Sequence, residues 1–441
     1  MATLEQAFSN TKLTENGDIA YSSTGKHLLD ILFMTEYYQN HLNEVVIGDS
    51  ENEKLFAMFI RDPRYGLGRR DLGRRLMRLA NVPLEDVVKA GRFDDIYGMI
   101  GWKEFMANEI MKGNELAKKW APRYSSKNLL LARDFAKYLG MNKQQYGKFV
   151  KAKTVERCLS SKNTGIIQFE HVPSLAMIKY YKRFLNGEDT AKRFEKYLED
   201  VKCGKSELKI STATVYDIYR NRNKIDPDMF FDKIEKIDIN CVPIVDSSGS
   251  MQNQNDSYGK AMAIGHYLAK CSTYAPNKVV SFSSKPVLLT LGKENVYYNG
   301  WRNLSCEYHQ ELGNLTGYNR EIASMHTGDV SNTDFGAVMQ LFQNVDELPQ
   351  YLVVLSDMEF DQGSKMSKDA LRNLWKEKGY TTKIVWWNLN ERSTTAPEID
   401  ADGNIFMSGY NPMLLKFLEA GFDGENLAII GTENSTHIAN H

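Results

Sequence analysis

The feature that most constrains the fold is a change of pattern near residue 237. Before it, apolar residues recur at spacings of three and four, as in Leu72, Leu76 and Leu79, which is the spacing of amphipathic helices. After it, uninterrupted apolar runs such as 241–245 and 351–355 alternate with helical patterns. Strands that are apolar along their whole length and alternate with helices predict a parallel sheet with both faces covered.

The pattern predicts two domains, which suits a chain of 441 residues because that length exceeds one ordinary hydrophobic core. Residues 1–236 are expected to form an all-α module, a bundle or solenoid-like stack of helices joined by short polar breaks. Residues 237–441 are expected to form an α/β doubly wound domain. The expected strands are 241–246, 278–282, 286–291, 351–357 and 382–390, and the expected helices are 256–271, 335–345, 370–379 and 412–421.

The charge is distributed unevenly between the two predicted domains, although the whole chain carries a net charge of only −1. Residues 1–240 hold 40 Lys and Arg side chains against 33 Asp and Glu, and the rest holds 15 against 23. A basic first half suits contact with an anion, and it equally suits contact with the acidic second half. Charge alone does not choose between them.

The composition indicates a globular protein with no membrane contact. No stretch approaches the roughly 18 consecutive apolar residues of a membrane helix. The first residues lack the basic start and apolar stretch of a secretory signal. The five cysteines stand far apart without a CxxC pair, which excludes a zinc ribbon and indicates reduced thiols. We therefore expect a cytoplasmic protein.

A candidate metal site follows from polar residues at the ends of predicted strands. Asp246 and Asp357 each end a strand, Ser248 and Ser250 lie on the turn after Asp246, and Thr333 immediately precedes a helix. Ligands of an open parallel sheet collect beyond the carboxyl ends of its strands. Carboxylates and hydroxyls form an all-oxygen set that suits Mg²⁺ or Mn²⁺. Because hydroxyls are neutral, the ion keeps positive charge and an open position for an acidic group of a partner protein.

These residues admit two other interpretations. Ser, Thr and Asp at turns commonly satisfy backbone donors only, but the ordered occurrence of all three elements favours metal binding. A serine nucleophile lacks both a G-x-S-x-G elbow and a suitably placed histidine. Because no nucleophile–base pair, phosphate loop or redox motif is visible, no enzymatic activity is expected.

The first half contains two basic stretches that suit RNA. Residues 61–80 hold seven arginines and two aspartates, and residues 101–160 hold 13 basic against 5 acidic side chains, interleaved with Trp120 and Tyr124. Guanidinium groups suit phosphate, and Tyr65 is placed to stack on a base. The alternative is a solvated helix face that pairs with acids elsewhere. The candidate RNA-binding residues are Arg61, Arg64, Arg69, Arg70, Arg74, Arg75, Lys118, Lys119, Arg123 and Lys127.

Three motifs of the second half resemble the metal-ion-dependent adhesion site (MIDAS) loops of von Willebrand factor A domains. They are VPIVDSSGSM (242–251), NTDFGAVM (332–339) and VVLSDMEFD (353–361). The resemblance implies a doubly wound, Rossmann-like sheet in which Ser248 and Ser250 bind the ion directly. Asp246, Thr333 and Asp357 would bind it directly or through water. The long insert between 291 and Thr333 departs from a minimal A domain.

The chain as a whole resembles an uncharacterised family of cellular and viral proteins. In that family a Ro-like (TROVE-type) helical module precedes an A domain. A more distant relative, the Ro autoantigen, is a ring of HEAT-like helical repeats that binds small noncoding RNAs and single-stranded RNA ends. The resemblance implies a non-enzymatic protein that binds small or single-stranded RNA. The alternative is a metal-dependent protein-interaction scaffold without RNA. The matching segments are 14–25, 59–76, 91–100, 119–127 and 171–184.

Overall fold

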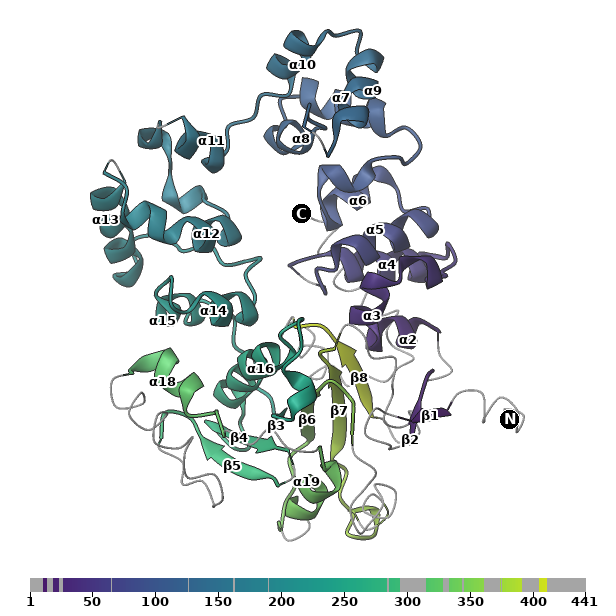
Figure 1. The fold of residues 1–441 in the computed structure, drawn as a ribbon, viewed down its shortest axis with the longest axis vertical. Coiled ribbons are helices and arrows are strands. Elements are labelled where there is room, and N and C mark those ends of the chain that lie inside the picture. Colours follow the sequence, from purple (N-terminus) through teal and green to yellow (C-terminus); the bar gives the residue numbers. More distant parts are fainter. Residues whose placement is uncertain are drawn as a thin grey trace. The chain divides into compact units, whose positions relative to one another are not determined.

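A computed structural model of the chain shows a helical region followed by a mixed α/β sheet region (Figure 1). The described residues fall into two compact units. The sheet unit comprises the described residues of Met1–Glu44 and Ala213–Asn426, and the helical unit those of Val45–Thr212. The structure describes residues 11–13, 19–23, 27–64, 66–125, 127–161, 163–188, 190–283, 285–293, 315–327, 333–342, 345–360, 373, 375–390 and 404–410.

The helical unit consists of short helices whose first turns are fixed by polar caps. Ser50 and Glu53 form a reciprocal capping box at the start of the first helix, and the Asn142 side chain accepts the backbone N–H of Gln145 at another. The elements are α4 (Glu51–Arg61), α5 (Arg70–Leu79), α6 (Leu84–Ala90), the 3-10 turn η2 (Phe93–Ile96), α7 (Trp102–Met111), α8 (Glu115–Trp120), α9 (Leu129–Tyr138), α10 (Lys143–Phe149), α11 (Val155–Ser160), η3 (Thr164–Ile166), η4 (Phe169–His171), α12 (Ser174–Leu185) and α13 (Ala191–Lys202).

The sheet unit contains a six-stranded sheet in the order β5-β4-β3-β6-β7-β8, all parallel except for the antiparallel β4–β5 pair. Its strands are β3 (Cys241–Asp246), β4 (Lys278–Phe282), β5 (Val287–Thr290), β6 (Tyr351–Ser356), β7 (Lys383–Asn388) and β8 (Ile405–Ser408). The other elements are β1 (Thr11–Leu13), β2 (Ile19–Tyr21), α2 (His27–Phe33), α3 (Thr35–Asn40), η1 (Leu42–Glu44), α14 (Val215–Asn221), α15 (Pro227–Phe231), η5 (Gly249–Met251), α16 (Ser257–Cys271), α18 (Gly317–Ala323) and α19 (Phe335–Leu341).

Helices cover both faces of the large sheet, as the doubly wound prediction requires. Helix α16 approaches one face so closely that a Cβ at Gly265 would stand 2.6 Å from Val245 Cγ2, with Leu355 also in contact. On the opposite face, Phe335 of α19 packs its ring 4.8 Å from that of Trp386. Val245 and Trp386 belong to alternate pairs of the register, and side chains of alternate residues point to opposite faces. The central strands are therefore buried from both sides.

The predicted domain boundary at residue 236 does not coincide with the division into units. Helix α2 packs on the edge strand β8, where the rings of Phe33 and Phe406 stand 5.0 Å apart. Helix α14 packs on α16, and the Tyr216 hydroxyl donates to Asp256 Oδ2 at 2.8 Å. The division into units has a physical reason, because apolar surfaces of the sheet unit are covered by helices α2 and α14, which precede β3 in the chain.

Three further expectations differ from the structure or extend beyond its described part. The first region was predicted to be almost wholly helical, but β1 and β2 form a two-stranded antiparallel sheet. The large sheet was predicted to be parallel, but its edge strand β5 runs antiparallel to β4. The predicted helix 412–421 lies outside the described residues, as do residues 370–372 and 374 of the predicted helix 370–379. Within the described part of the chain, no helix is long and apolar enough to cross a membrane.

Candidate metal centre and basic clusters

Two predicted carboxylates stand at the carboxyl ends of neighbouring strands. Asp246 ends β3 and Asp357 directly follows β6, and these strands pair in parallel. The loops that follow parallel strands converge at one edge of a sheet. Asp246 is 0% exposed and Asp357 is 1% exposed. The fold therefore brings the two acids into one buried environment.

Asp246 is held by hydrogen bonds from both strands' ends. The Ser356 hydroxyl donates to its Oδ2 at 2.6 Å, and the backbone N–H of Ser248 donates to its Oδ1 at 2.9 Å. The second bond folds the turn after β3 back toward the acid. On that turn the hydroxyl oxygens of Ser248 and Ser250 lie 3.1 Å apart. One carboxylate and two hydroxyls are thus gathered on a single turn.

Asp357 is in an environment that disfavours its charge. Burial, and after it the negative charge of Asp246, raises the pKa of Asp357 to about 8, although a hydrogen bond from Ser250 opposes the shift. Its Oδ1 accepts the backbone N–H of Glu359 at 3.3 Å. Its Oδ2 is buried and has no hydrogen-bond partner among the described residues. A cation beside both acids would favour their charged forms.

Thr333 lies at the same edge of the sheet. Asp334 donates its backbone N–H to the carbonyl of Ser283, which follows β4, and its side chain caps α19 by accepting the N–H of Ala337 at 3.1 Å. These bonds fix the backbone beside Thr333. The Thr333 side chain is 0% exposed, and its hydroxyl has no hydrogen-bond partner in the described part of the chain. Such a hydroxyl costs free energy unless a ligand binds it.

The five predicted residues fit a divalent cation by the chemistry of their donors. They offer two carboxylates and three hydroxyls, the oxygen ligands that Mg²⁺ and Mn²⁺ prefer. Two of the oxygens, Thr333 Oγ1 and Asp357 Oδ2, are the buried atoms without a partner described above. Among the described residues there is no group of three or more His, Cys, Asp or Glu that would suit a metal.

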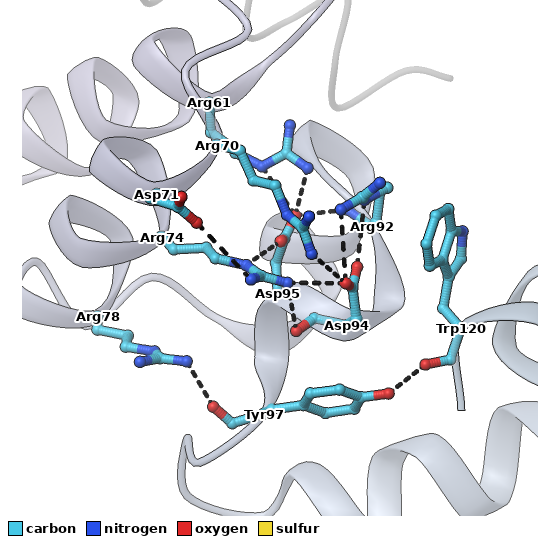
Figure 2. Close-up of polar contacts among 10 residues, drawn as sticks. All are labelled: Arg61, Arg70, Asp71, Arg74, Arg78, Arg92, Asp94, Asp95, Tyr97 and Trp120. Atoms are coloured by element: carbon cyan, nitrogen blue, oxygen red, sulfur yellow. Dashed lines mark hydrogen bonds and ion pairs between the residues drawn. The ribbon is translucent and has the colours of Figure 1, made fainter. Parts of the chain in front are cut away.

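In the helical unit, three of the predicted arginines contact the two aspartates of η2 (Figure 2). Arg61 Nη2 lies 2.6 Å from Asp95 Oδ2, and Arg70 Nη2 lies 2.5 Å from Asp94 Oδ2. Arg74 pairs with both acids. These contacts match the alternative in which the arginines pair with acids elsewhere. Contact of the same arginines with RNA stays a prediction.

The remaining residues of the first basic stretch differ in exposure. Arg69 is buried at 8% exposure, whereas Arg64 and Arg75 are exposed. Tyr65, predicted to stack on a base, lies outside the described residues. The stretch therefore does not present all its charges on one solvated face.

The second basic stretch surrounds a partly exposed tryptophan. Lys119 Nζ lies 5.3 Å from the centre of the Trp120 ring, and Lys118 pairs with an acid one turn earlier in α8 at 2.8 Å. Arg123 is exposed and donates to the backbone carbonyl of Lys118 at 3.3 Å. The fourth predicted residue, Lys127, is exposed. Lys119 therefore lies beside the Trp120 ring, and contact of these residues with RNA stays a prediction.

Sequence reasoning missed two cations that stack on aromatic rings here. The Arg92 guanidinium lies 4.0 Å from the centre of the Trp120 ring, and Lys143 Nζ lies 5.6 Å from that of Tyr124. Arg92 lies in the segment 91–100 that carries part of the family resemblance, but that segment does not reveal which residue Arg92 contacts. Arg92 and Trp120 are 28 residues apart in the chain, and only the fold brings them into contact.

Comparisons with known proteins add the following similarities. A domain of unknown function (DUF7788) matches residues 240–439, and another (DUF2828) matches residues 113–222. The chain is similar to the uncharacterized protein L728 of Acanthamoeba polyphaga mimivirus, with 24% identity over 503 residues that cover 92% of this chain and 84% of that protein. It is also similar to the crystal structure of the Deinococcus radiodurans RO (RSR) protein, with a TM-score of 0.38 and 13% identity, covering 86% of this chain and 82% of that one.

Proposed function

We propose that the sheet unit binds Mg²⁺ or Mn²⁺ and uses it to dock an acidic group of a partner protein. The observation that supports this proposal is the convergence of Asp246, Thr333 and Asp357 at one edge of the sheet, with two buried oxygens that lack hydrogen-bond partners among the described residues. We further propose that the protein is not an enzyme, because a docking role requires binding and no chemical step. We also propose that it acts in the cytoplasm.

Each residue of the proposed site has a separate part in holding the ion. Asp246 is oriented by Ser356 and contributes charge, and Asp357 contributes the second charge. Ser248, Ser250 and Thr333 contribute neutral hydroxyls. When bound, the ion supplies a positively charged open position that a carboxylate of the partner completes.

The first prediction tests this site by substituting Thr333. Thr333→Val replaces a hydroxyl that has no described partner with a methyl group of similar size. We expect it to leave stability in the absence of metal unchanged or higher, and to weaken Mg²⁺ or Mn²⁺ affinity roughly tenfold. Asp246→Ala should abolish binding. Calorimetric titration of the full chain, with and without an acidic peptide, measures these affinities.

Thr382 provides a matched control for Thr333. Its buried hydroxyl donates to the carbonyl of Pro349 at 2.8 Å. Thr382→Val should therefore cost about 1 kcal/mol of stability and leave metal affinity unchanged. The proposal fails if the wild type binds neither ion at millimolar concentration, or if Thr333→Val and Thr382→Val behave alike in the titration.

We also propose that the helical unit binds small or single-stranded RNA on the basic surface around Trp120 and Tyr124. The observation that favours it is the stacking of Arg92 and Lys119 on one ring and of Lys143 on the other. Partly exposed aromatic rings flanked by cations suit bases and phosphates together. The sequence resemblance to Ro-like modules leads to the same expectation.

The second prediction concerns the salt dependence of RNA binding. Each phosphate that the protein neutralises releases counterions, so the log–log slope of affinity against salt should be about −0.7 per phosphate for a single strand. Lys119→Glu combined with Arg123→Glu should weaken binding and flatten the slope by about 0.7 for each phosphate that is no longer neutralised. The slope is measured by fluorescence anisotropy of a labelled oligoribonucleotide.

The control for this prediction reverses two charges elsewhere on the same unit. Lys192→Glu combined with Lys196→Glu changes two exposed lysines of α13, which were not among the predicted RNA-binding residues, and should leave the slope unchanged. Asp246→Ala should not alter RNA affinity, because the proposed ion neutralises no phosphate of the RNA. Equal effects of the two double variants, or no salt-dependent binding by the wild type, would leave the metal-dependent scaffold as the better account.

A further inference from the structure

The arginines around η2 form a cluster with more positive than negative charge. The arginine cluster consists of Arg61, Arg70, Arg74 and Arg92 together with Asp94 and Asp95 (Figure 2). Four guanidinium groups face these two carboxylates, and the exposed Asp71 lies 4.0 Å from Arg74, so the positive charge exceeds the negative charge even with Asp71 included. A surplus of this kind inside a partly buried cluster favours binding of an anion.

The two inner arginines are fully engaged. Arg61 contacts Asp95 Oδ2 through Nε at 2.8 Å and through Nη2 at 2.6 Å, and only 4% of its side chain is exposed. Arg74 bonds Asp95, lies 2.9 Å from Asp94 Oδ2 and donates to the carbonyl of Asp94 at 2.8 Å. Its distance to Asp71, an acid that is 57% exposed, is 4.0 Å. Both carboxylate oxygens of Asp95 are therefore occupied by Arg61 and Arg74, whereas Asp94 contacts Arg74 and the other two arginines of the cluster.

The surplus charge is therefore carried by Arg70 and Arg92, the two outer arginines. Arg70 Nη2 lies 2.5 Å from Asp94 Oδ2, and Arg92 Nε lies 3.2 Å from Asp94 Oδ1. Both arginines therefore share this carboxylate with Arg74. Their side chains are 40% and 29% exposed, so solvent and a ligand can reach them. Burial, and with it the positive charge of Arg70, lowers the pKa of Arg92. The two outer guanidiniums repel each other, and an anion between them would remove that repulsion.

The position of Arg92 is fixed by its neighbours. Its guanidinium lies 4.0 Å from the centre of the Trp120 ring, and Lys119 brings a further cation to the same ring at 5.3 Å. The carbonyl of Trp120 accepts the hydroxyl of Tyr97, whose own carbonyl accepts Arg78 at 2.6 Å. A guanidinium held in this way loses little conformational freedom when it binds a ligand.

We infer that Arg70, Arg92 and Lys119 form a binding site for a phosphate monoester, such as a mononucleotide or the terminal phosphate of an RNA strand. A monoester carries a charge of about −1.5 to −2 at neutral pH, so it gains more from a positively charged cluster than an internal phosphodiester, which carries only one negative charge. Guanidinium groups bind phosphate oxygens in pairs of parallel hydrogen bonds. For the RNA strand the inference rests on the proposed RNA binding, and for the free mononucleotide it does not.

Two pairs of probes test the site on the full-length protein. Calorimetry should detect binding of adenosine 5′-monophosphate and none of adenosine. An oligoribonucleotide with a 5′-phosphate should bind about tenfold more tightly than the same sequence with a 5′-hydroxyl, the value of one charge-assisted hydrogen bond. Arg70→Gln combined with Arg92→Gln should abolish both differences. Arg133→Gln, which removes an exposed arginine of α9, should preserve them.

The outcomes separate this inference from the proposed RNA binding. Binding of the monophosphate without any RNA binding supports the site, assigns it to free mononucleotides and refutes the RNA proposal. RNA binding without a preference for the 5′-phosphate, and without binding of the monophosphate, overturns the site while RNA binding stands. The comparison of each probe with its dephosphorylated partner uses the wild type, so it remains decisive if the double variant does not fold.

Discussion

A buried hydroxyl or carboxylate oxygen without a hydrogen bond costs about 1–3 kcal/mol, so its presence requires a physical explanation. Thr333 Oγ1 and Asp357 Oδ2 are two such atoms among the described residues. Their residue types and their positions beside a helix start and a strand end were visible in the sequence. The lack of a hydrogen-bond partner was not visible, because it depends on which side chains and backbone groups surround each atom.

Other single residues at the sites could not be found from the sequence at all. Ser356 orients Asp246, but its role depends on the pairing of β3 with β6, 110 residues apart in the chain. Arg92 gains its role from Trp120 in the same way. Local patterns identify residues that act through their own type and position. They do not identify residues that act through a neighbour distant in sequence.

The third prediction concerns the contribution of His326 to the pH dependence of stability. Burial, and after it the charge of Arg222, lowers the pKa of His326 from 6.5 to about 4. The folded state therefore binds a proton less readily than the unfolded state. Stability from this residue is present above pH 6.5 and is lost as the pH falls from 6.5 to 4, up to about 3 kcal/mol. Urea denaturation across this range should show the loss, and His326→Gln should reduce it.

The control for the pH prediction is His171, which is exposed in η4. His171→Gln should leave the pH dependence of unfolding as in the wild type. The buried His266, whose pKa is lowered by burial, acts in the same direction as His326 and keeps part of the slope in both variants. A His326→Gln slope equal to that of the wild type would contradict the assignment.

At the scale of elements, the central strands were predicted because burial on both faces leaves an unbroken apolar run. The strands β3, β6 and β7 lie where those runs are. Of the edge strands, β5 was predicted as the strand 286–291 but not as antiparallel, and β8 was not predicted. The antiparallel direction of β5 is set by a short connection from β4, and β8 is only four residues long. Short edge segments contain too few residues to establish a period.

Helix α5 shows what an amphipathic pattern predicts and what it omits. Leu72 and Leu76 are buried at 0% exposure, as their spacing predicted. The arginines between them were expected off the buried stripe, where they would meet phosphate or acids elsewhere in the chain. Arg74 pairs with Asp94 and Asp95, because η2 packs beside the helix. A helical period identifies the apolar side of a helix, whereas the neighbours of its polar side depend on the packing of other elements.

At the scale of the whole molecule, the order of elements along the chain does not give the division into compact units. The change from helices to alternating strands near residue 237 was readable from the sequence, and the helical region does precede the sheet region. Two groups of residues before that point, the described residues up to Glu44 and those from Ala213 onward, nevertheless belong to the sheet unit. Glu36 donates its backbone N–H to Ser408 at 3.2 Å, and the Tyr267 hydroxyl donates to the carbonyl of Glu235 at 2.8 Å. Helical periodicity alone carries no information about which unit a helix covers.

The final prediction tests this division by hydrogen exchange on the full chain. Phe33 is fully buried in α2 and its ring packs on Phe406 of β8, so Phe33→Ala should cost about 3–5 kcal/mol. Exchange should quicken in β7 and β8 and remain unchanged in α12 and α13, because opening is cooperative within a unit. Phe184→Ala, a change of the same size in α12, should give the reverse pattern. Equal acceleration of exchange in β8 and α12 by Phe33→Ala would mean that the two units open together. The division of the chain into a sheet unit and a helical unit would then be wrong.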